Sequence, residues 1–548
     1  MARGTIRNMP DPVRLRRAAC LLAFVLAISI SAVARAGGAR FEVTLPEGSP
    51  ALGAGRVVVF LVREGSRVWD RDPADGPFWN DPQPLFGIDI GGLEPGASVT
   101  IDPGMDFPDA FPHPPARLVP GRYKAQAIFD GTRTESAWRR EAGNRFGEVV
   151  TFEIGEGEEP TLVRLSLERR TEAFEFPAHE SLREISIESK LLSDFRRAHH
   201  GDDAPVKLNA GVVLPIDYDP TKKYAAVYEI PGFGGRHDEA AGHIFRRGGD
   251  WSELRRRAFI IVLDPESPNG HTLFCDSRVN GPVGQALIEE LVPAMEKEFP
   301  LITEPWARIV TGHSSGGWSS LWLGVTYPDT FGAVWSTAPD PVDFRRFELI
   351  DIYSHENAYT DEQDQERPAA RFPAQRRQRG DRGEQQRTPG YYVTMTVREE
   401  NGGEGVLGPH NTSGQQWDSW MACWGNPDSQ NPRVAKPLFD AQTGALDHAE
   451  AKAYEAYDIR LLLSRHPDRY GPIFANNVRL ICGEMDNYYL NEAVSLLKEE
   501  LAKHELPEGP GYITLVPGAD HGMSLYMSPA MRAIPREMVE HLDDHQQR

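Results

Sequence analysis

The sequence predicts two kinds of fold in one chain: an all-β, sandwich-like domain over residues 37–170 and an α/β domain with a mostly parallel sheet over residues 171–548. Short strands separated by Gly, Pro and Asp clusters fill the first range. Strands alternate with helices in the second. A chain of 548 residues is long enough for two or three domains with their own cores.

The first 36 residues are expected to be a signal peptide. Arg14, Arg16 and Arg17 precede an apolar stretch over 18–33, and Ala34-Arg35-Ala36 has the form of a cleavage site. The apolar stretch is too short for a secure membrane span, although a retained N-terminal anchor remains the alternative. We therefore expect export, to the periplasm or outside the cell.

The predicted β domain contains six strands, at 41–45, 56–62, 98–101, 123–129, 148–154 and 162–167. Trp69, Phe78, Trp79 and Phe86 lie between the second and third of them and are expected on a loop. Such aromatic side chains either stack on a sugar or aromatic ligand or pack beneath the loop, and packing is the commoner role.

The predicted α/β domain has strands at 206–214, 224–230, 259–263, 307–311, 331–336, 478–482 and 512–516. Helices are expected at 283–297, 315–327, 491–504 and 528–542. Ligands of such sheets bind at the carboxyl ends of the strands.

A Gly-x-Ser-x-Gly motif stands at Gly312-His313-Ser314-Ser315-Gly316, between a predicted strand and a predicted helix. This context is the one that a nucleophile elbow needs, because the glycines permit a turn that exposes the serine hydroxyl at the sheet edge. Ser314 is therefore the candidate nucleophile. His313 is expected to pack or to form hydrogen bonds rather than to act in catalysis.

A serine nucleophile needs a base and an acid, which follow it in the order acid, then histidine, on this fold. Asp486 follows the strand 478–482, and His521 lies in the loop after the strand 512–516. We assign Asp486 as the acid and His521 as the base. Glu484 and Asp340 are the reserve acids, and Asp520 is expected to be a loop residue only.

The oxyanion of acyl transfer requires backbone N–H donors. One is expected at Ser315, at the start of the helix after the nucleophile. The other is expected from the loop Pro231-Gly232-Phe233-Gly234-Gly235, at Phe233 or Gly234, although an ordinary Gly-rich turn remains the alternative.

At these motifs the chain resembles the putative-esterase family of α/β-hydrolases, which includes S-formylglutathione hydrolase, feruloyl esterases and enterochelin esterases. The Pro-Gly-Phe-Gly-Gly loop, the Gly-His-Ser-Ser-Gly-Gly elbow, Asp276-to-Pro282, the segment around Asp486 and Asp520-His521-Gly522 carry the likeness. It covers roughly 205–345 and 471–545. The resemblance implies a Ser-Asp-His esterase without a cofactor, and it leaves the substrate open.

Residues 344–470 interrupt this pattern and are expected to form an insertion. The segment 362–386 is charged and poor in apolar residues, which predicts a solvated or disordered excursion. Residues 390–470 are expected to cap the active site, with an amphipathic helix over 449–463. Trp417, Trp420 and Trp424 either shape an apolar pocket there or pack the cap onto the main domain.

Composition and charge exclude several classes. A net charge of −21 argues against nucleic acid or an anionic membrane as a partner. Cys275, Cys423 and Cys482 follow the predicted cleavage site, an odd number, and no spacing supports a Cys275–Cys423 bridge. No cluster has metal-ligand spacing.

The sequence therefore predicts an exported serine esterase that acts on a small-molecule or carbohydrate-linked ester. The alternatives are an acyltransferase on the same scaffold, a less expected peptidase, and a non-catalytic carbohydrate- or partner-binding protein. The oligomeric state stays open.

Overall fold

The computed structural model describes residues 37–132, 135–157, 159–246, 248–373 and 390–547. The predicted signal peptide over 1–36 lies outside this range. Within the range, none of the helices combines the length and the apolar character needed to span a membrane.

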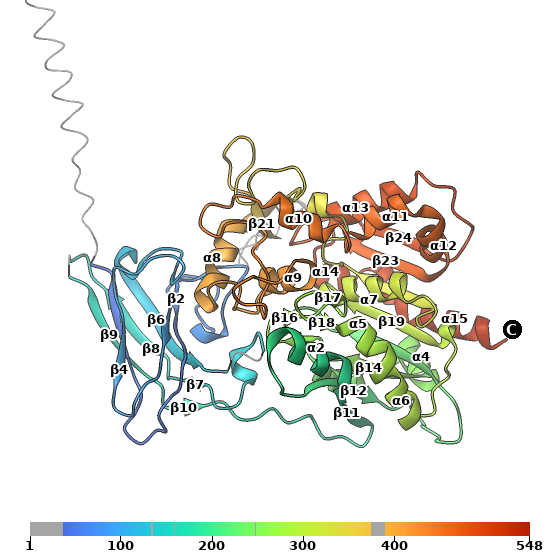
Figure 1. Ribbon diagram of the computed structural model, residues 1–548, viewed down its shortest axis with the longest axis horizontal. Helices are drawn as coiled ribbons and strands as arrows, with labels where there is room; N and C mark the ends of the chain where they lie inside the picture. Colours follow the sequence, from blue (N-terminus) through green and yellow to red (C-terminus); the bar gives the residue numbers. More distant parts are fainter. Residues whose placement is uncertain (1–36, 133–134, 158, 247, 374–389, 548) are drawn as a thin grey trace, which may run out of the picture.

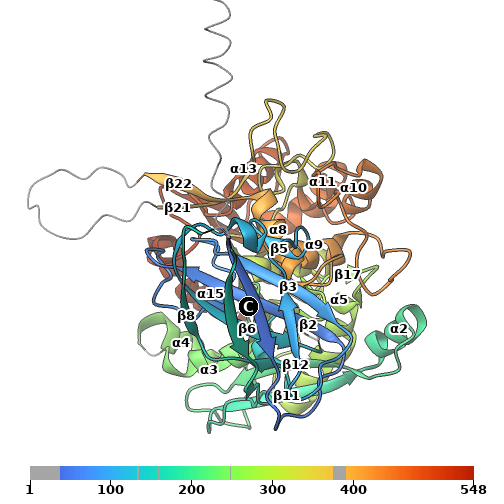
Figure 2. The ribbon, with the colours of Figure 1, turned by 90° about the vertical axis from the view of Figure 1, so that its left-hand side faces the viewer.

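Two β-sheets form the N-terminal part of the protein (Figures 1 and 2). The smaller sheet has the strand order β4-β1-β9, and the larger has the order β10-β7-β6-β2-β3-β5 with β8 paired to β6. The strands of the smaller sheet are β1 (Ala39–Thr44), β4 (Ser98–Ile101) and β9 (Thr161–Ser166). Those of the larger are β2 (Gly55–Arg63), β3 (Leu85–Ile90), β5 (Ala110–Phe111), β6 (Gly121–Asp130), β7 (Arg145–Phe146), β8 (Val150–Ile154) and β10 (Arg169–Arg170).

Side chains at alternate positions of each strand point toward the other sheet, so the two sheets face each other across a shared core. Phe41 and Val43 on β1 are fully buried, and they share one core with Val57 and Val59 on β2. Phe86 also belongs to this core, because it lies on β3 and stacks on Phe41 with ring centroids 5.7 Å apart. The expectation that Phe86 lies on a loop was wrong, since a short strand between two turns gives little periodicity to detect.

One eight-stranded sheet forms the centre of the remaining chain, in the order β11-β12-β14-β13-β19-β20-β23-β24. Neighbouring strands are parallel from β14 to β24, whereas β11 and β12 are antiparallel to their neighbours. The strands are β11 (Leu182–Ser189), β12 (Val206–Val213), β13 (Ala225–Ile230), β14 (Ala258–Leu263), β19 (Arg308–His313), β20 (Ala333–Thr337), β23 (Val478–Gly483) and β24 (Tyr512–Val516). The sequence did not predict β11.

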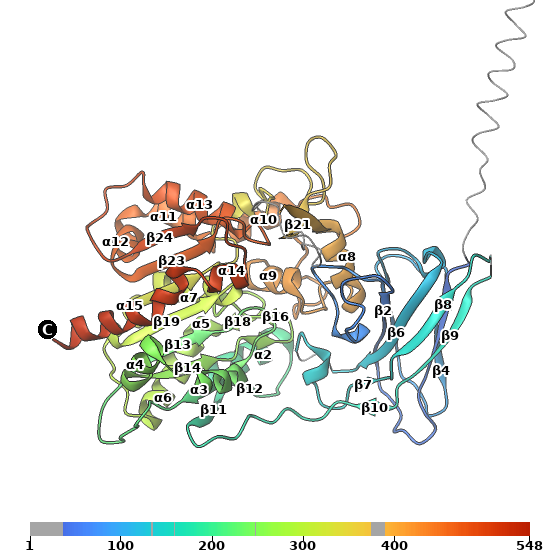
Figure 3. The ribbon, with the colours of Figure 1, turned by 180° about the vertical axis from the view of Figure 1, so that it is seen from behind.

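Helices cover both faces of this sheet (Figures 1 and 3). Helix α7 is buried along almost all of its length against β19 and β20, and α4 packs against α15. The helices outside the insertion are α2 (Lys190–His200), α3 (Ala240–Phe245), α4 (Gly249–Arg257), α5 (Val283–Ala286), α6 (Val292–Glu298), α7 (Ser315–Thr326), α13 (Leu490–Leu501), α14 (Met523–Tyr526) and α15 (Pro529–Gln546). One π-helical turn, Leu287–Leu291, joins α5 to α6.

The chain between β20 and β23 contains the insertion. Its residues 391–424 lie between the N-terminal sheets and the eight-stranded sheet (Figure 1), whereas its last helices pack beside β23 and α13. It contains β21 (Pro368–Pro373), β22 (Tyr391–Thr396), α8 (Val397–Leu407), α9 (Gln416–Trp424), α10 (His448–Tyr454), α11 (Ile459–Arg465) and α12 (Pro467–Asn477). Helix α8 begins with a capping box formed by Thr396 and Glu399.

Two expectations for the insertion need correction. The helix expected over 449–463 is two helices, because Asp458 starts α11 as its N-cap, with its carboxylate accepting from Leu461 N. The segment expected as an excursion over 362–386 includes strand β21, where Ala369 and Ala370 are fully buried. Residues 374–386 of that segment lie outside the described range.

The tryptophans of α9 pack rather than line an open pocket. Trp417 and Trp424 are fully buried, and Trp420 is 3% exposed. Trp424 packs on Phe344 with centroids 4.8 Å apart and on Trp318 of α7 at 5.2 Å. These rings fix the insertion against the helix that follows the predicted nucleophile.

All three described cysteines are buried and free. Cys275 and Cys423 do not form a disulfide. The Sγ of Cys423 lies 3.3 Å from the carbonyl oxygen of His271. These thiols act as small packing groups.

Candidate active site

Ser314 occupies the tight turn between β19 and α7, where its backbone has φ 59° and ψ −124°. A non-glycine residue with positive φ is strained, and such strain is typical of a nucleophile elbow. A Cβ on Gly316 would lie only 1.9 Å from the carbonyl oxygen of Ile230, and a Cβ on Gly312 would lie 2.2 Å from that of Gly316. Both motif glycines are therefore required by the close approach of backbone to backbone.

His521 and Asp486 lie side by side at the carboxyl ends of β23 and β24. The Nδ1 of His521 lies 2.7 Å from Oδ2 of Asp486, a carboxylate with no exposed surface. The other carboxylate oxygen of Asp486 accepts from the backbone N–H of Tyr488 at 2.9 Å. This arrangement leaves Nε2 of His521 available to act as a base.

Burial lowers the pKa of His521, but the charge of Asp486 and its hydrogen bond outweigh burial, so the net pKa is raised above its ordinary value. The ring of His313, next to Ser314 in the chain, lies 4.5 Å from that of His521. Among the described residues, no hydrogen bond joins Ser314 to His521. Such bonds are often long in ligand-free enzymes and tighten when substrate binds.

His313 has the supporting role that was expected of it. Its Nδ1 lies 3.1 Å from Oγ1 of Thr337 on the neighbouring strand β20. Burial and the nearby His521 hold the pKa of His313 well below its ordinary value. The ring is therefore neutral and packs beside the catalytic histidine without a competing charge.

The reserve acids lie elsewhere. Asp340 accepts from Ser315 Oγ at 2.7 Å and from Trp420 Nε1 at 2.6 Å, and burial raises its pKa to about 6. Glu484 is exposed and accepts from Gly518 N at 3.2 Å. Asp520 accepts from Gly522 N at 3.0 Å within its own loop. The geometry thus favours Asp486 as the acid that orients His521.

The predicted oxyanion loop follows β13 and faces the elbow. A Cβ added to Gly232 would lie 3.5 Å from Cβ of Ser314. Gly235 N donates to Gly232 O at 2.9 Å, which closes a turn with Phe233 and Gly234 at its centre. Gly234 has φ +75°, a conformation that favours glycine.

Two donors of this turn remain free for a ligand. Within the described part of the chain, the N–H groups of Phe233 and Gly234 donate to no other residue. His271 supports the base of the loop, because its Nε2 lies 2.9 Å from Pro231 O. Burial lowers the pKa of His271 to about 4, so this ring is neutral.

Several positioning residues were not predicted from the sequence. Asn487 accepts from His521 N at 2.9 Å and donates to Arg371 O at 2.6 Å. Arg371, on β21 of the insertion, also donates to the backbone oxygen of Asp486 at 2.9 Å. Asn487 follows the acid directly, so its position was a usable signal, whereas Arg371 is too distant in the sequence to give one.

The insertion also reaches the nucleophile side of the site. Gln416, at the start of α9, places Nε2 3.4 Å from Oγ of Ser315. Together with the bond from Trp420 to Asp340, this contact joins α9 to the residue directly after Ser314.

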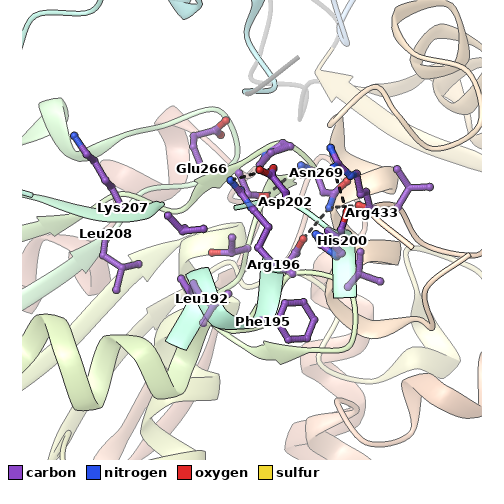
Figure 4. Close-up of a pocket in the computed structure, with 18 of the residues that line it drawn as sticks. Leu192, Phe195, Arg196, His200, Asp202, Lys207, Leu208, Glu266, Asn269 and Arg433 are labelled. Atoms are coloured by element: carbon purple, nitrogen blue, oxygen red, sulfur yellow. Dashed lines mark hydrogen bonds and ion pairs between the residues drawn. The ribbon is translucent and has the colours of Figure 1, made fainter. Parts of the chain in front are cut away.

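A separate cavity of about 380 Å³ lies beside α2 and β12 (Figure 4). Its lining does not include Ser314, Asp486 or His521. Several of its polar side chains bind one another or nearby backbone: Arg196 pairs with Asp202 at 3.9 Å, Asn269 donates to Asn280 at 2.9 Å, and Arg433 donates to His200 O at 3.2 Å. This cavity is not the catalytic site.

No group of three or more His, Cys, Asp or Glu side chains suited to a metal ion occurs among the described residues. The arrangement around Ser314 instead has the parts that acyl transfer uses: a strained serine, a histidine–carboxylate pair and free N–H groups.

Residues 204–448 match a protein-family model described as putative esterase. A ferulic acid esterase is 12% identical to this chain, with a TM-score of 0.37, over 66% of this chain and 98% of that protein. An S-formylglutathione hydrolase from Agrobacterium tumefaciens is 13% identical, with a TM-score of 0.35, over 67% and 95%. FphF, a fluorophosphonate-binding serine hydrolase of Staphylococcus aureus, is 11% identical, with a TM-score of 0.35, over 66% and 98%.

Proposed function

We propose that the protein, whose residues 204–448 match the putative-esterase model, is a carboxylic ester hydrolase that acts through Ser314, His521 and Asp486. The observation that carries this assignment is the 2.7 Å pair of His521 Nδ1 and Asp486 Oδ2 beside the strained turn of Ser314. The pair fixes the histidine tautomer that can accept a serine proton.

In the proposed reaction, Ser314 Oγ attacks the ester carbonyl carbon while His521 Nε2 takes its proton. The N–H of Ser315 and that of Phe233 or Gly234 stabilise the oxyanion. The intermediate collapses to an acyl-enzyme, and His521 returns the proton to the departing alcohol. Water, activated by His521, then attacks the acyl-enzyme and releases the acid.

Asp486 keeps its charge throughout and stabilises the imidazolium that forms on His521. Its buried position strengthens this interaction, since the surrounding protein has a low effective dielectric constant. Asn487 and Arg371 hold the acid loop in place through backbone contacts.

We propose that the insertion acts as a fixed cap. Its α9 is bound to the residue after the nucleophile through Gln416, and its β21 is bound to the acid loop through Arg371. We further propose that the protein is exported, which rests on the arginines and apolar stretch of residues 1–36.

Hydrolysis of a panel of short-chain and aryl esters by the purified protein tests the assignment. We expect turnover by the wild type and a loss of at least about 10³-fold in kcat for Ser314→Ala. Ser186→Ala, at an exposed position on β11, is the matched control and should keep wild-type activity. Equal turnover by the wild type and Ser314→Ala would contradict the proposal.

A further inference from the structure

A second cavity lies between the N-terminal sheets and the predicted oxyanion loop. Its volume is about 340 Å³, within the range of small-molecule sites. Three parts of the chain line it: Phe233 and Gly234 of the oxyanion loop, Val58 and Trp138 of the N-terminal part, and Leu407 of the insertion.

The N-terminal wall of this cavity is firmly attached to the catalytic part. Glu135 pairs with Arg236, which follows the oxyanion loop, at 3.1 Å. Ser136 Oγ donates to Glu266 at 3.0 Å, and Gln415 Nε2 donates to Ser136 O at 3.0 Å. The segment of the β region that carries Trp138 is therefore held at a fixed place beside the oxyanion loop.

The cavity borders the predicted oxyanion loop, although Ser314, Asp486 and His521 themselves do not line it. Phe233 and Gly234 line it and supply the free N–H groups proposed for the oxyanion. Gln415 lines it as well, and its neighbour Gln416 contacts Oγ of Ser315. A ligand in this space would therefore contact the loop that is proposed to bind the oxyanion.

The charged side chains on the cavity wall have ion-pair or hydrogen-bond partners within the protein. Asp75 pairs with Arg139 at 2.8 Å and with Arg71 at 3.6 Å. Asp130 accepts from Asn144 Nδ2 at 3.0 Å. A charged ligand would compete with these pairs for its partners. An uncharged ligand would leave the pairs intact and contact the apolar side chains of the cavity wall.

We propose that this cavity, which we call the interdomain subsite, binds an uncharged, mainly apolar group of the ester beyond the reacting carbonyl. The N-terminal β region is then a wall of the substrate site and selects substrates by size and polarity. The inference rests on the proposed function, because it places the ester carbonyl at Ser314.

Narrowing the interdomain subsite tests this inference. Ala137→Phe places a ring on its N-terminal wall, and Leu407→Trp narrows it from the insertion side. Ala142→Phe is the matched control, because Ala142 is exposed five residues away and does not line the cavity. Thermal unfolding of each variant verifies that it is folded.

The readout is the kcat/KM of a bulky ester divided by that of methyl acetate, measured in a pH-stat. Methyl benzoate tests the acyl side and phenyl acetate tests the alcohol side. We expect at least one of these ratios to fall by about tenfold or more in Ala137→Phe and in Leu407→Trp, and neither to change in Ala142→Phe.

Ratios within about twofold of the wild type in both narrowed variants, with an active wild type, would overturn the subsite alone. A wild type that hydrolyses none of the three esters and resists a serine-directed phosphonate would instead contradict the proposed function itself. The two failures are thus distinguishable.

Discussion

Replacing Asp486 with Asn tests the histidine–carboxylate pair without changing the shape of the side chain. In the wild type, Oδ1 of Asp486 accepts from the N–H of Tyr488 at 2.9 Å and Oδ2 lies 2.7 Å from His521 Nδ1. In Asp486→Asn, the amide oxygen keeps the backbone donor, so the NH₂ group faces His521. Nδ1 must then accept, Nε2 carries the proton, and the ring cannot take a proton from Ser314.

The expected loss in kcat is about 10³- to 10⁴-fold, which corresponds to about 4 to 5.5 kcal/mol in the activation free energy. The assay is the steady-state hydrolysis of phenyl acetate at pH 8, with circular dichroism to verify folding. Asp340→Asn and Glu484→Gln are the comparison variants, and we expect each to keep activity within about tenfold of the wild type. If Asp486→Asn stays within tenfold, or Asp340→Asn loses more activity than Asp486→Asn, the assignment of the acid is wrong.

Three further predictions concern pH and stability. Because the net pKa of His521 is raised above 6.5, kcat/KM should rise with pH through a midpoint above 6.5, and a pH profile with a lower midpoint would contradict the pairing with Asp486. Gly316→Ala should destabilise the protein by at least about 2 kcal/mol in thermal or urea unfolding, because its Cβ meets Ile230 O, whereas Gly242→Ala, with open space around it, should not; equal stability would refute this. Burial and the neighbouring acids raise the pKa of Glu348 well above its ordinary value, so the wild type loses stability with rising pH, because this carboxyl ionises in the unfolded chain at a lower pH than in the folded protein. The free energy of unfolding of Glu348→Gln, compared with that of the wild type, should therefore increase by roughly 1–3 kcal/mol from pH 5 to pH 9 in urea unfolding. A difference between the two proteins that does not depend on pH would exclude this cause.

Much of the sheet and the elbow could be predicted because their signals are local. The strand before Ser314 and the helix after it follow from apolar runs around two glycines, and the chain order of acid and histidine follows from the fold. The family match over residues 204–448 confirms the resemblance that these motifs indicated. The roles of Ser314, Asp486 and His521 remain predictions.

The contacts that depend on distant segments could not be predicted. Arg371 reaches the backbone of Asp486 from a part of the chain with no detectable pattern, because its function depends only on where β21 packs. Phe86 was assigned to a loop since β3 lies in a stretch rich in Pro and Asp. Asp458 ends one helical pattern and starts another, and only its capping bond distinguishes two helices from one.

The interdomain subsite could not be predicted from the sequence for the same reason. Ala137 and Leu407 lie 270 residues apart, and neither belongs to a motif. Their common lining of one cavity depends on the attachment of Ser136 to Glu266 and Gln415.

The most direct test of the account is to locate the covalent adduct that a fluorophosphonate forms with the wild-type protein, by peptide mass spectrometry. We predict one adduct per chain, on the peptide that contains Ser314, and none in Ser314→Ala. An adduct on another residue, or equal labelling of Ser314→Ala, would show that Ser314 is not the nucleophile.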